Sequence, residues 1–425
     1  MSRPRAVVVA TGSELVRGER TDLNGPFLAR EALRLGLEPA RIAIVGDGPA
    51  ELETTLREAL SSADAVLVSG GLGPTHDDRT VELVAKALGL GLRVDPELEA
   101  QIEAVSRAAA ERLRRDYADF APGVTKQATV PEGAISLGLA GTAPGLVIPR
   151  EGGRLVVMLP GPPAELKRLW PNALDTEVFR ALLARTTPPG RRVLRLFGVS
   201  ESAVARALAD AGGDGDGVDV TICARDFEIH VDLVVQPGAE ARAEALEAAL
   251  VEPIAQWVYG RDDRGVEEHV LDLCRDRGLT LATAESCTGG LVAARLTSVP
   301  GSSDVVLGGI VAYANAVKEA ELGVSEALLR DHGAVSAEVA EAMAHGARVR
   351  LGADVVVSVT GVAGPDGGTP EKPVGLVYVH AEGPSAGVGR ELSFPGDRAS
   401  IRARAVVIAL HLVRTLLERS RDEVV

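Results

Sequence analysis

The sequence predicts an α/β protein of three domains, on three observations. Short apolar runs alternate with helical patterns over the first part of the chain and again over its last part. The 425 residues suffice for about three domains of ordinary size. Segments rich in proline, glycine and charged residues, at 188–190 and 260–265, interrupt the alternation. We therefore expect domains at 1–172, 175–260 and 264–425.

The first domain is expected to contain a doubly wound parallel sheet. Residues 7–10, 42–45 and 65–68 are continuous apolar runs rich in valine and isoleucine. Such runs are typical of strands that helices bury on both faces. Residues 51–60 and 80–88 space their apolar side chains as helices do. Strands that alternate with helices in this way favour parallel pairing.

The middle domain is predicted to be a small α+β unit, and the last domain another α/β unit. In the middle domain we expect strands at 193–197 and 229–233, helices at 201–210 and from 239, and a glycine-rich loop at 212–217. In the last domain we expect strands at 280–284, 305–312, 355–359 and 376–380, and a final helix at 400–418.

Composition argues against several classes of function. The 45 basic and 60 acidic side chains give a net charge of −15, which repels nucleic-acid backbones, and aromatic residues make up only 3% of the chain. No apolar stretch has the roughly 20 residues of a membrane helix. The three cysteines form no CxxC pair. We expect a cytoplasmic protein that has neither nucleic acid nor membrane as a partner.

The densest chemistry lies at 284–290, AESCTGG, where a predicted strand turns into a helix. Free N–H groups at a helix start can stabilise an oxyanion, so Ser286 is a candidate nucleophile. Alternatively, Ser286 or Thr288 simply caps the helix. Cys287 is a rival nucleophile, because a helix start lowers a thiol pKa. No histidine lies in a motif near Cys287, so we interpret this cysteine as a packing residue.

Three later segments add polar residues at strand ends or helix starts. They carry Tyr313 and Lys318, Thr360 and Gly361, and Arg398 with Arg402. Strand ends of open α/β sheets hold ligand loops, and the two arginines share one helix face on which they could hold a phosphate. Each segment also has an ordinary explanation: a surface lysine, a tight glycine turn and two solvated arginines.

Together these motifs resemble the C-terminal nicotinamide-nucleotide amidase domain of the CinA family. The resemblance covers nearly all of 266–425. Its motifs occur in order: AESCTGG, PGSS at 300–303, GGIVAYANAVK, GAVSAEVAEAM, TGVAGPDGG, KPVGLVYV and FPGDR. Several of them are long, and their combination is specific.

The resemblance implies a serine–lysine hydrolase that converts nicotinamide mononucleotide and water to nicotinate mononucleotide and ammonia, in pyridine nucleotide salvage. Ser286 would attack the carboxamide carbon, Lys318 would be the general base, and Tyr313 would orient Lys318 or the substrate. The expected substrate-binding residues are the amides of Thr288, Gly289 and Gly290 for the oxyanion, and Thr360, Gly361, Arg398 and Arg402 for the ribose phosphate. This acyl chemistry needs no metal or other cofactor. Lys318 would need a lowered pKa.

A second glycine-rich segment, 68–80, follows a predicted strand and opens a helix. It lacks the Gly-Lys-Ser/Thr of a P-loop and the GxGxxG of a dinucleotide site, but its glycines let a phosphate approach the backbone. Asp77 and Asp78 are candidate ligands for a divalent metal, or they complement the helix dipole.

This region resembles the molybdopterin-binding fold that CinA proteins share with molybdenum-cofactor enzymes. The matching segments are ATGSEL at 10–15, TDLN at 21–24, VGD at 45–47, GGLGPTHDD at 70–78, KQA at 126–128, GTAPG at 141–145 and LPGPP at 159–163. The resemblance implies a metal-dependent ADP-ribose pyrophosphatase. Its phosphate loop would contain Gly70, Gly71, Gly73, Pro74 and Thr75, and its cleft would be lined by Thr11, Glu14, Asn24 and Lys126. The chain departs from the pattern at Val124-Thr125 and Gly138, where the family often has asparagine.

The middle domain resembles the family's KH-like domain, which we interpret as a spacer or a contact in a homodimer. Small-molecule nucleotides are the expected partners. Two other classes of function stay open: a sensor whose N-terminal domain only binds a nucleotide or pterin, and an interaction protein linked to competence, as the family's name suggests.

Overall fold

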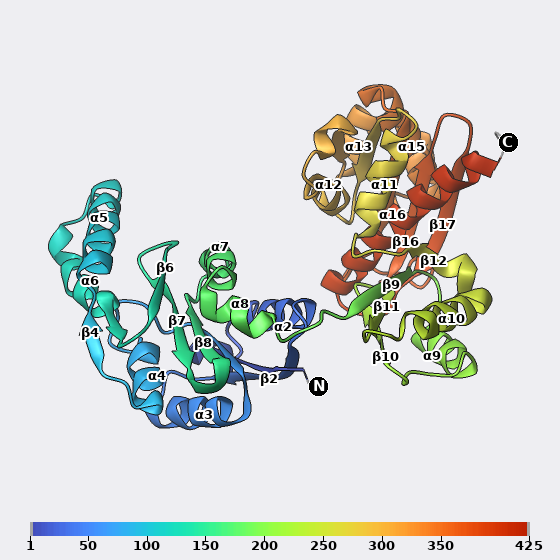
Figure 1. Ribbon diagram of the computed structural model, residues 1–425. Coiled ribbons are helices and arrows are strands. Elements are labelled where there is room, and N and C mark those ends of the chain that lie inside the picture. Colours follow the sequence, from blue (N-terminus) through green and yellow to red (C-terminus); the bar gives the residue numbers. More distant parts are fainter. Residues whose placement is uncertain (1–2, 423–425) are drawn as a thin grey trace. The chain divides into compact units, whose positions relative to one another are not determined.

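The computed structural model of the protein describes residues 3–422 (Figure 1). The chain folds into two compact units that divide after Gly190. The first unit corresponds to the predicted first domain. The second contains the predicted middle and last domains packed together. Among the described residues, no helix combines the length and apolarity that crossing a membrane requires.

The first unit is built on a six-stranded sheet with the order β2-β1-β3-β8-β7-β6. These strands are β1 (Arg5–Thr11), β2 (Glu38–Val45), β3 (Ala65–Ser69), β6 (Ile135–Leu139), β7 (Pro144–Arg150) and β8 (Arg154–Leu159). The first four in the order are parallel, as predicted. Strand β7 pairs antiparallel with β8, and β6 pairs antiparallel with β7. A short separate pair joins β4 (Leu92–Val94) to β5 (Thr129–Pro131).

Helices cover both faces of this sheet (Figure 1). On one face lie α3 (Pro49–Ser62), α4 (Thr80–Leu88), α5 (Pro96–Leu113) and α6 (Ala121–Ala128); on the other lie α2 (Asn24–Arg34), α7 (Pro163–Leu174) and α8 (Glu177–Leu183). The strand side chains alternate between the two cores: Val7 and Val9 face one, Ala6 and Val8 the other. This two-sided burial explains the continuous apolar runs at 7–10 and 65–68. The expectation that 42–45 is also buried is wrong, because β2 is the edge strand and Ile42 and Ile44 are exposed.

The middle module contains a four-stranded sheet with the order β10-β11-β9-β12. Its elements are β9 (Gly190–Leu196), α9 (Glu201–Asp210), β10 (Val218–Arg225), β11 (Glu228–Val235), α10 (Glu240–Val251) and β12 (Val258–Gly260). One core joins the sheet to α9 and α10. The predicted start of this domain at residue 175 is wrong, because Phe179 and Leu182 of α8 are buried in the first unit's core. Residues 175–190 therefore belong to the first unit.

The last part of the chain forms a five-stranded sheet with the order β14-β13-β15-β16-β17. Its strands are β13 (Leu281–Glu285), β14 (Val306–Val311), β15 (Val355–Gly361), β16 (Leu376–Glu382) and β17 (Gly387–Ser393). The first three in the order are parallel, and β16 and β17 are antiparallel. The carboxyl ends of β13 and β15 therefore meet at one edge of the sheet.

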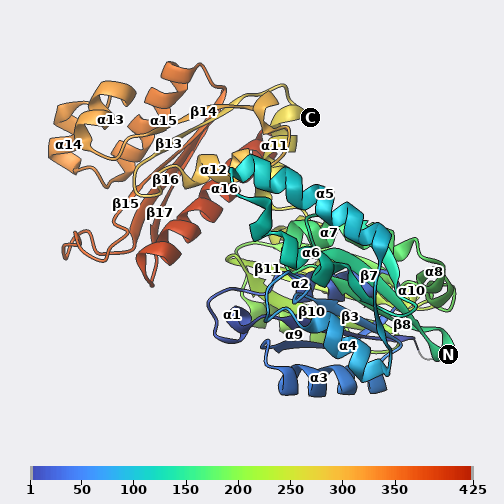
Figure 2. The ribbon, with the colours of Figure 1, turned by 90° about the vertical axis from the view of Figure 1, so that its left-hand side faces the viewer.

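Figure 2 shows helices on both faces of this second sheet. One face carries α11 (Val266–Arg275), α12 (Leu291–Thr297) and α16 (Arg398–Asp422); the other carries α13 (Asn315–Leu322), α14 (Glu326–His332) and α15 (Ala337–Leu351). The long helix α16 also contacts the middle module. There the buried His411 ring hydrogen-bonds through Nε2 to the Glu228 carboxylate at 2.6 Å and stacks on Phe197.

Candidate active site

Ser286 lies where β13 ends and the chain turns into α12. Its backbone N–H donates to the Val359 carbonyl of the neighbouring strand β15 at 2.8 Å, so the sheet fixes its position. The turn needs two left-handed residues, which Gly289 (φ 61°) and Gly290 (φ 94°) supply without steric cost. The Ser286 side chain is nearly buried. This is the strand–turn–helix arrangement that the AESCTGG motif predicts.

Lys318 projects from α13 into the same site and is only 1% exposed. Its Nζ lies 3.1 Å from the Ser286 Oγ, 2.8 Å from the Ala312 carbonyl oxygen and 3.2 Å from the Tyr313 carbonyl oxygen. A neutral amine has two hydrogens and one lone pair. Since two neighbours are carbonyls that only accept, an uncharged Lys318 donates to both and turns its lone pair toward the serine hydroxyl.

Burial lowers the pKa of Lys318 below its usual value. Desolvation penalises the ammonium form, because transfer of a charge out of water is costly. Within the described residues no carboxylate forms an ion pair with Lys318. The site therefore raises the share of the neutral lysine, the form that can accept a proton from Ser286, above that of a solvated lysine.

Cys287, the neighbour of Ser286, is a buried packing residue. Its side chain is 5% exposed and belongs to the hydrophobic core between the sheet and α16. Burial raises the pKa of the thiol to about 11. The thiolate, which is the nucleophilic form, is therefore scarce at neutral pH. The geometry favours Ser286 over Cys287.

The backbone amides of the loop are used differently from the prediction. The Gly289 N–H donates to the Ser286 carbonyl at 3.1 Å, and the Gly290 N–H donates to the Glu285 carboxylate at 2.9 Å. Neither is free for an oxyanion. Among the described residues the amides of Cys287 and Thr288 donate to no oxygen, and both face the sulfur of Cys287, a weak acceptor. Of the three amides predicted for the oxyanion, that of Thr288 alone has no oxygen acceptor.

Tyr313 and Arg398 lie together at the open side of the site. The Tyr313 side chain is 60% exposed. Arg398, the first residue of α16, donates from Nη2 to the Tyr313 hydroxyl at 2.8 Å and from Nη1 to the Gly364 carbonyl at 2.9 Å. These two contacts leave other N–H groups of the guanidinium for an anion.

The other predicted phosphate ligands also contact neighbouring parts of the protein. The buried Thr360 hydroxyl donates to the Ala334 carbonyl at 2.7 Å, and Gly361 belongs to the β15–β16 ladder opposite Val377. Arg402 donates from Nη2 to the Thr288 carbonyl at 2.7 Å. These contacts help to hold the site together, while the Arg402 Nε is buried without a hydrogen-bond partner among the described residues. A role of these three residues in phosphate binding stays a prediction, and Arg398 is the most exposed candidate.

Sequence reasoning missed Glu285, which lies inside the AESCTGG motif. Its side chain is 1% exposed and its carboxylate accepts four hydrogen bonds. An acidic residue at the end of an apolar strand was a usable signal, because a buried carboxylate must find donors.

The first unit carries a cleft of about 620 Å³ at the carboxyl ends of its parallel strands. Predicted residues that line it are Thr11, Glu14, Asn24, Gly70, Gly71, Gly73, Asp77 and Asp78. Two buried atoms among them, the Thr11 Oγ1 and the Asn24 Oδ1, have no hydrogen-bond partner within the described residues. A Cβ at Gly70 would lie 2.5 Å from the Thr11 carbonyl oxygen, so glycine is needed there.

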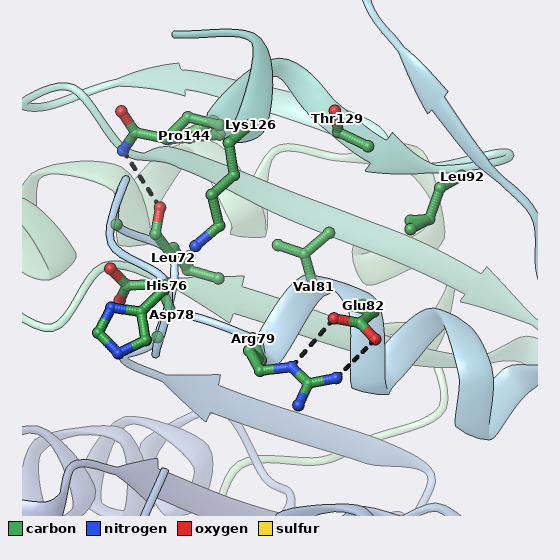
Figure 3. A pocket seen from close by; sticks show the side chains of 13 residues that line it. Leu72, His76, Asp78, Arg79, Val81, Glu82, Leu92, Lys126, Thr129 and Pro144 are labelled. Carbon is green, nitrogen blue, oxygen red and sulfur yellow. Dashed lines mark hydrogen bonds and ion pairs between the residues drawn. The ribbon is translucent and has the colours of Figure 1, made fainter. Parts of the chain in front are cut away.

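Lys126 does not line this cleft, but the pocket that it lines shares Gly71, Gly73 and Asp78 with the cleft. It lines a neighbouring pocket of about 340 Å³ with His76, Arg79 and Glu82 (Figure 3), and its Nζ contacts the Thr75 carbonyl. Lys126 therefore supports the glycine loop. Pro74 and Thr75, which were predicted in the phosphate loop, line neither of these two pockets.

The candidate metal ligands Asp77 and Asp78 both accept hydrogen bonds from the Thr75 hydroxyl. The described residues contain no group of three or more histidine, cysteine or acidic side chains arranged to hold a metal ion. Of the departures from the family pattern, Val124 is buried in the core and Gly138 adopts φ 81°.

Three family models match the chain. They are described as the CinA C-terminal domain over residues 263–417, the KH domain of damage-inducible protein CinA over 191–260, and a probable molybdopterin binding domain over 7–179. Among solved structures, competence/damage inducible protein CihA from Agrobacterium tumefaciens is 42% identical, with a TM-score of 0.35, over 36% of this chain and 93% of that chain.

Full-length relatives are also similar. A CinA-like protein of Mycolicibacterium vanbaalenii is 43% identical over 419 residues, which cover 97% of this chain and 98% of that protein. A CinA-like protein of Mycobacterium tuberculosis is 42% identical over 422 residues, with 97% of each chain covered. With all three domains matched and the similarity spanning the whole length, the chain belongs to the CinA family.

Proposed function

We propose that the C-terminal domain hydrolyses the carboxamide of nicotinamide mononucleotide to give nicotinate mononucleotide and ammonia. The observation that carries the proposal is the 3.1 Å contact between the Lys318 Nζ and the Ser286 Oγ in a site where burial lowers the lysine pKa. The CinA-type sequence around both residues supports the choice of substrate class.

In the first half-reaction Ser286 Oγ attacks the carboxamide carbon while its proton passes to Lys318 Nζ. The carbonyl π bond breaks and the oxygen becomes an oxyanion, which the free amides of Cys287 and Thr288 can stabilise. The intermediate then expels the amide nitrogen, which takes the proton from Lys318 and leaves as ammonia. An ester between Ser286 and the nicotinoyl group is left.

In the second half-reaction water attacks this ester. Lys318, uncharged again, accepts the proton of the water and returns it to Ser286 Oγ as the ester bond breaks. Arg398 and Tyr313, at the open side of the site, bind the ribose phosphate. All proton transfers thus use one amine whose two carbonyl contacts hold its lone pair toward the serine.

The test is ammonia release from nicotinamide mononucleotide by the purified full chain, with nicotinate mononucleotide identified as the second product. Wild type should release one ammonia per product formed, and Ser286→Ala should release none. A wild-type chain that releases no ammonia would refute the proposal.

For the first unit we propose a second function, the binding of a nucleotide diphosphate such as ADP-ribose. The two unpartnered buried atoms, Thr11 Oγ1 and Asn24 Oδ1, favour a polar ligand in the cleft. The described residues form no metal-binding group of three, and the proposal is limited to binding of the nucleotide.

Equilibrium binding of ADP-ribose tests this second proposal. Asn24→Ala should weaken binding at least tenfold. The control Asn172→Ala should not weaken it, because the Asn172 amide also donates to a backbone carbonyl but does not line the cleft. Equal binding by wild type and Asn24→Ala would contradict it. Cleavage of ADP-ribose that depends on Mg²⁺ would extend the proposal to a pyrophosphatase.

A further inference from the structure

Glu285 and Arg402 hold the loop that carries the candidate nucleophile from two sides. Among the described residues neither side chain hydrogen-bonds to Ser286 or Lys318, yet both hydrogen-bond to the loop backbone at residues 288–293. The amides that donate to no oxygen, those of Cys287 and Thr288, lie between Glu285 itself, at the end of β13, and the Thr288 carbonyl that Arg402 holds.

Glu285 binds the segment that follows the loop. Its Oε2 accepts from the N–H groups of Gly290 at 2.9 Å and Val292 at 3.1 Å, and its Oε1 accepts from the N–H of Ala293 at 2.9 Å. Oε1 also accepts from the Thr283 hydroxyl at 3.3 Å. Both oxygens of this carboxylate, which is 1% exposed, thus accept hydrogen bonds from the start of α12. These N–H groups are therefore not available to bind an anionic group of a substrate.

Arg402 binds the loop itself, from α16. Its Nη2 donates to the Thr288 carbonyl at 2.7 Å, and a Cβ at Gly289 would lie 3.4 Å from that nitrogen. The guanidinium therefore packs against the turn. Because a peptide unit is planar, holding the Thr288 carbonyl fixes the orientation of the peptide between Thr288 and Gly289. It also restrains the ψ torsion of Thr288.

We propose that Glu285 and Arg402 are positioning residues that aim the free amides of Cys287 and Thr288 at the oxyanion of the reaction. This inference rests on the proposed amidase function. Glu285 holds the segment after the turn and Arg402 holds the turn, so the two free amides keep one orientation. An oxyanion site is effective only when its donors are held in place before the charge develops.

The substitution Glu285→Gln separates this role from simple packing. Glutamine keeps the size of the side chain but has only one acceptor oxygen, so its NH₂ group must face N–H donors on one side. Arg402→Gln removes the hold on Thr288 at a half-buried position. The control is Asp354→Asn, which removes a carboxylate that caps the opposite end of β13 through Thr280. The control should keep its activity.

Two measurements on the full chain test the inference. Loss of one oxyanion donor typically lowers kcat by about 10²–10³-fold, so loosening the loop should lower kcat for nicotinamide mononucleotide at least ~10-fold with KM changed less than ~3-fold. The second probe is the 3-carbaldehyde analogue of the mononucleotide. Ser286 Oγ adds to its carbonyl carbon, the π bond breaks and the hydroxyl proton passes to Lys318, which creates the oxyanion without a leaving group.

Binding of this aldehyde should weaken by about the same factor as kcat/KM in both variants, because it imitates the transition state. Binding of the product, nicotinate mononucleotide, should be unchanged. A variant with normal kcat and normal aldehyde affinity, beside an active wild type, overturns the inference and leaves the proposed function standing. An equal loss of aldehyde and product affinity, or a shift of the acid limb of the pH profile, also overturns it. An inactive wild type would overturn both.

Discussion

Replacing Lys318 with methionine should remove the activity while the fold persists. Methionine fills nearly the same space as the lysine stem but has no lone pair that can accept the Ser286 proton. Positioned general bases contribute about 10²–10⁴-fold. At about 1.36 kcal/mol for each tenfold change, that is about 2.7–5.4 kcal/mol of the activation free energy. We expect kcat/KM to fall by at least ~10²-fold.

The effect on stability should be small because two terms oppose each other. The variant loses the hydrogen bonds to the Ala312 and Tyr313 carbonyls, at about 0.5–1.5 kcal/mol each. It also removes the cost of burying an amine that is charged below its folded-state pKa. The melting temperature should therefore move by only a few degrees, since ~1 kcal/mol corresponds to about 2–4 °C in a domain of this size.

The pH dependence has a defined sign. Burial lowers the pKa of Lys318 in the folded chain, so between that pKa and the unfolded value of 10.5 the unfolded chain binds more protons. The free energy of unfolding of wild type should thus rise with pH across this window, relative to Lys318→Met. Wild-type activity should rise through the folded-state pKa of Lys318, because only the neutral amine accepts a proton.

The assay is ammonia release against pH, with melting followed in parallel. Lys372→Met is a matched control, because Lys372 also donates from Nζ to a backbone carbonyl, that of His332, in the same domain. It should keep its activity. If Lys318→Met kept more than a tenth of wild-type kcat/KM with the same pH profile, Lys318 could not be the base.

Three other substitutions follow from the same contacts. Cys287→Ala should keep more than half of the activity, because burial raises the pKa of the Cys287 thiol to about 11. Ser286→Cys should be at least ~10²-fold slower than wild type. The reverse pattern would identify Cys287 as the nucleophile. Arg398→Gln should raise KM for the mononucleotide at least ~10-fold but leave KM for nicotinamide riboside unchanged, because hydrogen bonds to a charged phosphate contribute about 1.5–3 kcal/mol. Burial lowers the pKa of His411 to about 4, so between pH 6.5 and about 4 the unfolded chain binds more protons than the folded chain. Urea titrations should therefore show the free energy of unfolding falling as the pH falls through this window. The substitution His411→Asn should make that fall smaller.

Much of the fold was predictable from local patterns. The apolar runs at 7–10 and 65–68 are strands buried on both faces, and both lie in the parallel part of the first sheet. The antiparallel hairpin of β6 and β7 was not predicted, because Ile135–Leu139 is partly exposed and contains Gly138, so its apolar pattern is short and broken. The boundary at 175 failed for a related reason. The seven residues of α8 carry a helical pattern that does not show which core Phe179 enters.

By itself the sequence determined the chemical inventory of the candidate site: an alcohol at a strand–helix turn, and a lysine and an arginine at the starts of later helices. Motif order and residue type suffice for this, because they are local properties of the chain. Tertiary structure alone decided how each group is used. Whether Lys318 is neutral depends on burial by α13 and the sheet, and whether Thr360, Arg402 or Gly290 is free depends on partners from other elements. Hydrogen bonding and desolvation depend on distances in space, which no local pattern of residues records.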